Sequence, residues 1–347
     1  MSSCCRQRTP ELESAYRRIL DLVEDASSIA ISGHTSPDGD ALGSVLGLGL
    51  ALSARYPHKE VTFLLADRAP VPRIYQFMEG ADRFVPAADV SGNPDLFISV
   101  DCPVTERLAD SAQVLARART VACFDHHPAR EEFADATVRC VNAAATAVLI
   151  EDFLSWAGIE LTGEIATCLL CGLVTDTGRF QYQNADPAAF ACAARLVDAG
   201  AEPSRISLEV YQSQRLGYLK LESLVMSRIH TVADGKVAYS YAYASDLTGY
   251  GVTSDECDGL VDVVRAVRGV EVCLFVKETE CCHRVRGNLR SKCDLDVSGV
   301  AAAFGGGGHV AAAGFTYEGS IVETLNDALP MLCELVGADA EGIHVEL

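Results

Sequence analysis

Residues 34–44 read HTSPDGDALGS and come directly after the apolar run Ile29–Ile31. His34, Asp38 and Asp40 are thus placed in one short loop at the end of a predicted strand. Carboxylates held this close repel each other, so a positive charge is expected between them. The proline and glycine of the loop are typical of a turn, but a turn does not explain the histidine or the paired acids. The stretch therefore favours a metal ion at the carboxyl end of a strand.

Short β-rich runs alternate with helical patterns through the first half of the chain. We predict strands at 28–32, 61–66, 96–100 and 121–124, and helices at 10–25, 41–54, 144–157, 163–174 and 186–199. This alternation predicts an α/β domain over residues 1–199, with a mostly parallel sheet flanked by helices on both faces. Residues 200–215 contain Gly, Pro and Ser and are predicted to form a linker.

The second half, residues 216–347, has a different texture. An Ala-Asp-Gly turn between 228–232 and 236–243 predicts a hairpin. A helix near 255–267 and strands near 270–277 and 283–290 follow. The glycine-rich stretch 305–308 is expected to form a loop between two helices of small residues, the second beginning near His309. These patterns predict a smaller α+β domain.

Four polar clusters of the first half each lie at or just beyond the end of an apolar run. They are His34 with Asp38 and Asp40, then Asp101, then Asp125 with His126 and His127, and finally Asp176. Loops at the carboxyl ends of parallel strands meet in one crevice, so three clusters are expected to converge there, and the fourth can join from a helix end. Mixed Asp and His ligands suit an ion such as Mn²⁺. There are enough ligands for two ions, which can clamp a phosphoryl group.

Each cluster also has an explanation that involves no metal. A His-His pair is commonly a surface or capping feature, and Asp176 can cap the turn that begins at Thr177. Asp38–Gly43 resembles the opening of a calcium loop, but Leu42 and Gly49 occupy positions where such a loop needs oxygen ligands. Four clusters at the ends of elements are nevertheless hard to attribute to turns alone.

Two further motifs, GNLRS at 287–291 and FGGGGHVAAAG at 304–314, lie in the second half. Consecutive glycines let backbone N–H groups point at an anion, and a helix beginning near His309 would add its positive end. Gly306, Gly308 and Ala311 fit the spacing of a dinucleotide-binding fingerprint, but a helical pattern precedes them where that motif needs a strand. No Lys-Ser or Lys-Thr follows, which excludes a P-loop. A hinge explains the glycines but not His309.

The net charge of −20 argues against a basic face that binds long nucleic acids. The 14 cysteines are scattered, and the amino-terminal stretch MSSCCRQRTPELES has no apolar segment typical of secretory targeting. We therefore expect a cytoplasmic protein with reduced thiols. The apolar surroundings of Cys168 and Cys171 indicate buried thiols rather than a zinc or redox site. The apolar stretch LGSVLGLGLALS is too short to span a membrane.

The motifs HTSPDGDALGS, SVD, FDHH and GLVTDTG, in this order, resemble those of the DHH phosphoesterase superfamily. NLRS and FGGGGHVAAAG resemble its DHHA1-type carboxyl-terminal domain, so the likeness covers nearly the whole chain. Length and domain pairing are most similar to the bacterial NrnA-like proteins, described as oligoribonucleases (nanoRNases) that also act on 3′-phosphoadenosine 5′-phosphate (pAp). The resemblance implies a DHH domain and a DHHA1 domain with the active site in the cleft between them.

The resemblance also implies a role for each candidate residue. One Mn²⁺ would be held by His34, Asp38 and Asp101, and a second by Asp40, Asp101, His126 and Asp176, with Mg²⁺ or Co²⁺ as alternatives. His127 would face the scissile phosphate, and Asp125 would orient an imidazole. Substrate would be bound by Arg290, Ser291, Gly306, Gly307, Gly308 and His309.

The function implied is Mn²⁺-dependent hydrolysis of short oligoribonucleotides, of about two to five nucleotides, and of pAp to AMP, by a hydroxide that bridges two ions. Linear or cyclic dinucleotides such as pGpG, pApA and cyclic di-AMP are the alternative substrates. A family II pyrophosphatase would lack the glycine-rich loop, and a RecJ-like exonuclease would be longer, with basic grooves. A non-catalytic nucleotide-binding scaffold would be expected to have lost a metal ligand. The resemblance allows a homodimer and implies neither long nucleic acid nor membrane as a partner.

Overall fold

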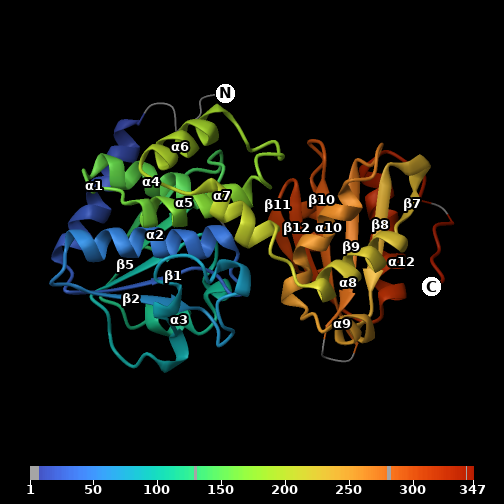
Figure 1. Cartoon of the computed structure of the whole chain (residues 1–347), viewed down its shortest axis with the longest axis horizontal. Helices are drawn as coiled ribbons and strands as arrows, with labels where there is room; N and C mark the ends of the chain where they lie inside the picture. Colours follow the sequence, from blue (N-terminus) through green and yellow to red (C-terminus); the bar gives the residue numbers. More distant parts are fainter. Residues whose placement is uncertain (1–7, 129–130, 280–282, 341) are drawn as a thin grey trace. The chain divides into compact units, whose positions relative to one another are not determined.

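The computed structural model describes residues 8–128, 131–279, 283–340 and 342–347. The chain divides into two compact units, Met1–Ser213 and Gln214–Leu347 (Figure 1). Each unit has its own six-stranded sheet and its own apolar core. None of the described helices combines the length and the apolarity that crossing a membrane requires.

The sheet of the first unit is parallel throughout, which confirms the predicted α/β fold. Its strands are β1 (Ser28–Ser32), β2 (Glu60–Leu65), β3 (Phe84–Pro86), β4 (Leu96–Val100), β5 (Thr120–Asp125) and β6 (Ala136–Arg139). They are ordered β3-β2-β1-β4-β5-β6, so the chain runs from β1 to one edge and then returns to the other side of β1. This reversal opens a crevice at the carboxyl ends of β1 and β4. The edge strands β3 and β6 are not among the predicted strands.

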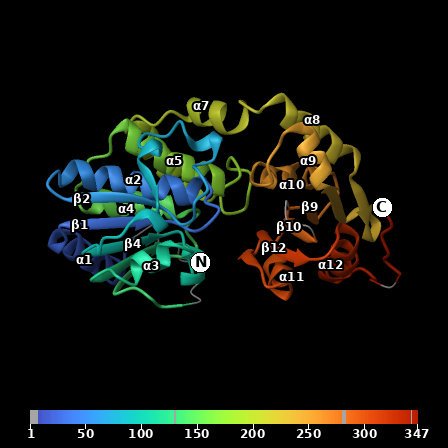
Figure 2. The same ribbon diagram turned by 90° about the horizontal axis from the view of Figure 1, so that it is seen from below.

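Helices cover both faces of this sheet, as the predicted fold requires. The main core is formed by the apolar faces of α1 (Pro10–Asp25), α2 (Gly39–Arg55), α4 (Thr146–Trp156) and α5 (Gly163–Asp176). Figure 2 shows α2 and α5 on one side of the strands and the short helix α3 (Ser111–Leu115) on the other. α3 packs over Phe97 and Val121, and α6 (Pro187–Asp198) packs against α4 and α5.

Glycines allow α2 and α5 to cross at very short range. A Cβ added at Gly43 of α2 would overlap the carbonyl oxygen of Cys168, and one at Gly47 would lie 2.5 Å from the side chain of Leu169. At Gly43 no other residue therefore fits without moving a helix, whereas at Gly47 the side chain of Leu169 would have to shift. The crossing matters for the loops at its end, because α2 begins beside Asp38 and α5 ends at Asp176.

Gly43→Ala tests this close crossing. We expect a loss of about 1–3 kcal/mol in the free energy of unfolding, because the added methyl group forces α2 away from a backbone carbonyl that cannot yield. Urea denaturation measures the change. The matched control is Gly249→Ala in α9 (Ala244–Tyr250), where a Cβ meets nothing within 4 Å, and where helix propensity favours alanine. Equal stability of the two variants would contradict the interpretation.

The second unit contains a mixed sheet with helices on both faces. Its strands are β7 (His230–Val232), β8 (Val237–Ala242), β9 (Val272–Glu278), β10 (Arg284–Ser291), β11 (Gly307–His309) and β12 (Ala312–Glu318), in the order β11-β12-β10-β9-β8-β7. β8 and β9 are parallel, and the other pairs are antiparallel. The helices of one face are α8 (Leu216–Ser227), α9 and α10 (Val261–Arg265), and those of the other are α11 (Val297–Ala303) and α12 (Ile321–Leu335).

The helix predicted to begin near His309 is wrong. His309 ends β11, and the alanines that follow form β12, which pairs with β10 along its whole length. Burial explains the error, because Ala313 and Phe315 alternate with more exposed neighbours and pack on the core of the second unit. Pairing with a neighbouring strand therefore outweighs the helix propensity of alanine. The glycine-rich stretch consequently has no helix amino terminus to offer an anion.

Two smaller differences concern the linker and the cysteines. The predicted linker contains α7 (Pro203–Ile206) and a π-helical turn, Ser207–Tyr211. Nine of the described cysteines, Cys168 and Cys171 among them, are free thiols. Cys140 is instead disulfide-bonded, which departs from the expectation of reduced thiols at that position. Burial raises the pKa of Cys168 to about 12, so this thiol is not a ready nucleophile.

Candidate metal centre

The polar residues of the four loops meet at the crevice of the first sheet. His34, Asp38 and Asp40 follow β1, Asp101 follows β4, His126 follows β5, and Asp176 ends α5. Two groups form, each with ligand atoms within 4.8 Å of one another: His34 with Asp38 and Asp101, and Asp40 with His126 and Asp176. All six side chains come from one unit, so this convergence depends on a single sheet and its helices.

Asp101 lies between the two groups. Its Oδ2 is 3.5 Å from Nε2 of His34, and its Oδ1 is 3.4 Å from Nε2 of His126. The residue is 2% exposed. Its backbone is left-handed, with φ of 55°, a conformation that costs a non-glycine residue about 1 kcal/mol or more. A hydrogen bond from its N–H to the carbonyl of Phe124, at 2.9 Å, holds the turn. Such strain is typical of a residue retained for its side chain.

The two histidines are oriented as metal ligands are. Nδ1 of His34 lies 2.9 Å from the carbonyl oxygen of Thr35, and Nδ1 of His126 lies 3.1 Å from that of Ala143. A carbonyl oxygen only accepts, so each Nδ1 carries the proton and each Nε2 faces the carboxylates. Nε2 of His126 is 3.1 Å from Asp176 Oδ2. Nε2 of each ring therefore faces carboxylates, and a divalent ion in place of a proton between them would fit this donor set.

The pKa values of the carboxyls reflect crowding at low dielectric. Burial and the neighbouring carboxylates Asp101 and Asp176 raise the pKa of Asp40 well above its usual range. Burial also raises the pKa of Asp176, more than its hydrogen bond to His126 lowers it. Asp101 is buried as well, but the imidazoles of His126 and His34 beside it hold its pKa well below its usual range. Asp101 is therefore ionised, and a bound cation would relieve the repulsion that raises the other two pKa values.

The amino terminus of α4 positions two of the acids. The N–H groups of Thr146 and Ala147 donate to the two oxygens of Asp40 at 2.6 and 3.0 Å. The hydroxyl of Thr146 donates to Asp101 Oδ1 at 2.9 Å. Sequence reasoning missed Thr146, because threonine within AAATAVL looks like one more small residue. Its only sequence signal is its position at the start of a predicted helix, where N–H groups are left without helical acceptors.

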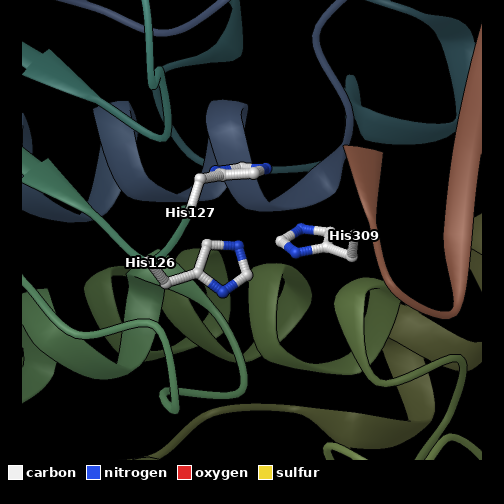
Figure 3. Close-up of side chains that lie close together, drawn as sticks. All are labelled: His126, His127 and His309. Carbon is white, nitrogen blue, oxygen red and sulfur yellow. The ribbon is translucent and has the colours of Figure 1, made fainter. Parts of the chain in front are cut away.

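His127 and Asp125 form a second arrangement beside the metal ligands. Nδ1 of His127 lies 2.9 Å from Asp125 Oδ1 and 3.5 Å from Asp101 Oδ1. Asp125 is completely buried, and its other oxygen is 3.5 Å from Nε of Arg139. Figure 3 shows the imidazoles of His126 and His127 next to each other, and their ring centres are 4.7 Å apart. Asp125 thus orients one imidazole, and His127 presents its Nε2 away from that carboxylate.

The predicted substrate-binding residues lie in the second unit. Arg290 on β10 and His309 on β11 both pair with Ala312 of β12, so they flank it in one row across the sheet. Gly306 has no space for a side chain, because a Cβ would overlap the carbonyl of Gly314, and Gly308 adopts φ of 148°. The hydroxyl of Ser291 is buried and donates to the carbonyl of Cys293 at 2.8 Å. Ser291 therefore supports the loop after β10.

The fold and this site define a class of protein that comparison identifies. Residues 28–173 match the model of the DHH family, N-terminal domain, and residues 234–338 match the DHHA1 domain. The chain therefore contains a DHH family N-terminal domain followed by a DHHA1 domain.

Relatives extend over most of the chain. This chain is 29% identical over 301 residues to the bifunctional oligoribonuclease and PAP phosphatase NrnA of Thermus thermophilus. The matched region covers 87% of each of the two chains. The protein of the same name from Bacillus subtilis is 25% identical and covers 83% of this chain and 88% of its own. An exopolyphosphatase-related protein of Bacteroides fragilis has the same fold, with a TM-score of 0.84 at 23% identity, over 94% of this chain and 98% of its own.

Thr146→Val tests the positioning of the acids. The variant keeps both backbone donors to Asp40 but loses the hydroxyl that donates to Asp101. We expect Mn²⁺ affinity, measured by titration calorimetry, to fall about 10- to 100-fold. The control is Thr248→Val, whose hydroxyl donates only to the carbonyl of Ala244 within α9. Unchanged affinity in Thr146→Val would remove Thr146 from the site.

Proposed function

We propose that this chain is a Mn²⁺-dependent phosphoesterase that hydrolyses short oligoribonucleotides to nucleoside monophosphates and pAp to AMP. The observation that carries the proposal is the buried carboxylate of Asp101, within 3.5 Å of His34 and 3.4 Å of His126, which joins two ligand groups at one crevice. The DHH family N-terminal domain and the names of the relatives from Thermus thermophilus and Bacillus subtilis support the same class of reaction.

The donor set supports two divalent ions. One would be held by His34, Asp38 and Asp101, and the other by Asp40, Asp101, His126 and Asp176. Oxygen and imidazole donors without a thiolate favour Mn²⁺ over zinc, with Mg²⁺ or Co²⁺ as weaker alternatives. Bound ions of this kind lower the pKa of a coordinated water and stabilise charge on phosphoryl oxygens.

His127 is the residue we assign to the substrate phosphate. Its Nδ1–H donates to Asp125, which fixes the proton on Nδ1 and leaves Nε2 to face the substrate. With a proton on both ring nitrogens, His127 would also donate from Nε2 to a phosphoryl oxygen and stabilise the charge that develops during attack at phosphorus. Nε of Arg139, 3.5 Å from the other oxygen of Asp125, places a positive charge beside that buried side chain.

Arg290 and His309 in the second unit would bind the far end of the substrate, and the glycines beside His309 allow it to approach the backbone. A chain of net charge −20 repels long polyanions, which favours substrates of a few nucleotides in the cytoplasm. Dinucleotides such as pGpG, pApA or the products of cyclic di-AMP contain the same phosphoester and remain the second candidate substrates.

A panel of substrates tests the proposal. The Mn²⁺-loaded protein is offered a labelled RNA dinucleotide, pAp, a twenty-four-nucleotide single strand and pyrophosphate, and product release is followed by chromatography. We expect turnover of the dinucleotide and of pAp, with the long strand and pyrophosphate spared. Turnover of pyrophosphate alone would refute the assignment, and no turnover at all would favour a nucleotide-binding scaffold.

Two variants separate metal binding from substrate binding. Asp101→Asn keeps a residue that tolerates the left-handed backbone but removes the charge shared by both ligand groups, so we expect Mn²⁺ binding and hydrolysis to be lost together. His127→Asn is expected to bind Mn²⁺ normally and to lose about 10²- to 10³-fold in kcat. Calorimetry and steady-state kinetics measure the two effects. Full activity of Asp101→Asn would exclude the proposed mechanism.

A further inference from the structure

A strained turn follows Asp176 directly. Gly178, Arg179 and Phe180 all adopt positive φ angles, of 53°, 63° and 60°. The turn is fixed by hydrogen bonds from the N–H of Phe180 to the hydroxyl of Thr177, at 3.1 Å, and from the N–H of Arg179 to the carbonyl of Val174, at 2.8 Å. Two successive non-glycine residues in this conformation cost free energy, so the turn is held for what its side chains do.

The chain after the turn is fastened to the metal centre. The side-chain amide of Asn184 donates to the carbonyls of Asp176 and Ala144, each at 3.0 Å. Ala144 lies just before the amino terminus of α4, which positions Asp40 and Asp101. Asn184 therefore ties the far end of this segment to backbone beside two elements that carry candidate ligands.

The turn builds an aromatic stack that faces solvent. Phe180 stacks on Phe190, near the start of α6, with ring centres 4.9 Å apart and planes at 25°. Phe190 is 54% exposed, and it is the one exposed phenylalanine among the described residues. Phe180 covers one face of the Phe190 ring, and the rest of the ring is exposed to solvent rather than packed in the core. An exposed aromatic face is a sequence-tolerant platform for a nucleobase.

Arg179 supplies a cation on the same turn. Its guanidinium lies 4.8 Å from the ring centre of Tyr211, which orients the group without neutralising it. The side chain is exposed, and within the described part of the chain it has neither an ion pair nor a side-chain hydrogen bond. The chain has a net charge of −20, yet the guanidinium of Arg179, three residues after Asp176, is paired with no carboxylate of the described residues. Such a cation is suited to an anionic ligand.

We propose that Arg179, Phe180 and Phe190 form a nucleotide subsite that adjoins the metal centre, in which Phe190 stacks on a base of the substrate and Arg179 binds a phosphate next to the scissile one. The subsite rests on the proposed function and deepens it, because it requires a substrate with both a base and a second phosphate. It selects nucleotides over pyrophosphate, which has no base to stack.

A second copy of the chain is the rival occupant, because Val197, also on α6, is exposed as well. The cation on the strained turn favours a nucleotide, since an apolar interface between copies depletes charge at its centre. The turn comes directly after Asp176, a candidate metal ligand, and this position also favours a nucleotide over a second copy.

The test compares an RNA dinucleotide with the same molecule in which one base is replaced by an abasic ribose. Phe190→Ala should raise KM for the intact dinucleotide about 5- to 150-fold, with kcat little changed, because stacking of one base is lost. The abasic dinucleotide should be equally poor for wild type and Phe190→Ala. Arg179→Gln should raise KM for both substrates alike.

The matched control is Val197→Ala, which removes apolar surface from the same helix but leaves the stack intact. Sedimentation of every variant reports the oligomeric state. Unchanged KM in Phe190→Ala, or dissociation of a dimer by Phe190→Ala and Val197→Ala alike, would overturn the subsite and assign the surface to a second copy.

A non-hydrolysable dinucleotide that carries 2-aminopurine separates this proposal from the function. Stacking on Phe190 should quench its fluorescence with wild-type, Mn²⁺-loaded protein but not with Phe190→Ala. Quenching without turnover of any natural dinucleotide would refute the proposed function and retain the subsite. Turnover without quenching would do the reverse.

Discussion

Repulsion among buried carboxylates is the constraint on which the first unit depends. Asp40, Asp101 and Asp176 converge where water is largely excluded, and burial makes their charges costly. Among the described residues, the fold stabilises these carboxylates with hydrogen-bond donors rather than with Lys or Arg side chains. The amino terminus of α4 directs two N–H groups at Asp40, and Ser44 adds a hydroxyl 3.3 Å from the same carboxylate. These bonds orient the acids without adding a positive charge of the protein's own, and a site for divalent ions needs this.

The helix crossing beneath the site sets how far apart the ligands lie. α2 begins beside Asp38 and α5 ends at Asp176. The glycines of α2 let its backbone pack directly on α5, against the carbonyl of Cys168 and the side chain of Leu169. Gly172 of α5 shows the same principle at the site itself, since a Cβ there would lie 2.6 Å from Asp40 Oδ1. Ligand spacing in metal sites tolerates only a few tenths of an ångström. Residues that touch no ligand atom therefore decide whether the ligands fit an ion.

The parallel sheet could be predicted from the sequence because short β-rich runs alternate with helical patterns. The convergence of the polar clusters could be anticipated for the same reason, since strand ends share one edge. β12 escaped prediction because alanine and glycine carry little β signal, and only pairing with β10 makes the segment a strand. Thr146 escaped because its role depends on three dimensions, as the hydroxyl reaches an acid 45 residues away. The turn at Arg179 and Phe180 was not predicted, because neither arginine nor phenylalanine is typical of a positive φ angle.

The left-handed backbone of Asp101 has a consequence for how this chain changes over generations. Glycine or asparagine would relax that turn, and an apolar residue in place of a crowded acid would relieve its neighbours. Substitutions that abolish metal binding would thus tend to raise thermal stability, so folding alone selects against the ligand set. A lineage released from the chemistry would be expected to drift toward a more stable, metal-free form. Retention of the whole set of acids and imidazoles in this chain is therefore what the proposed metal chemistry requires.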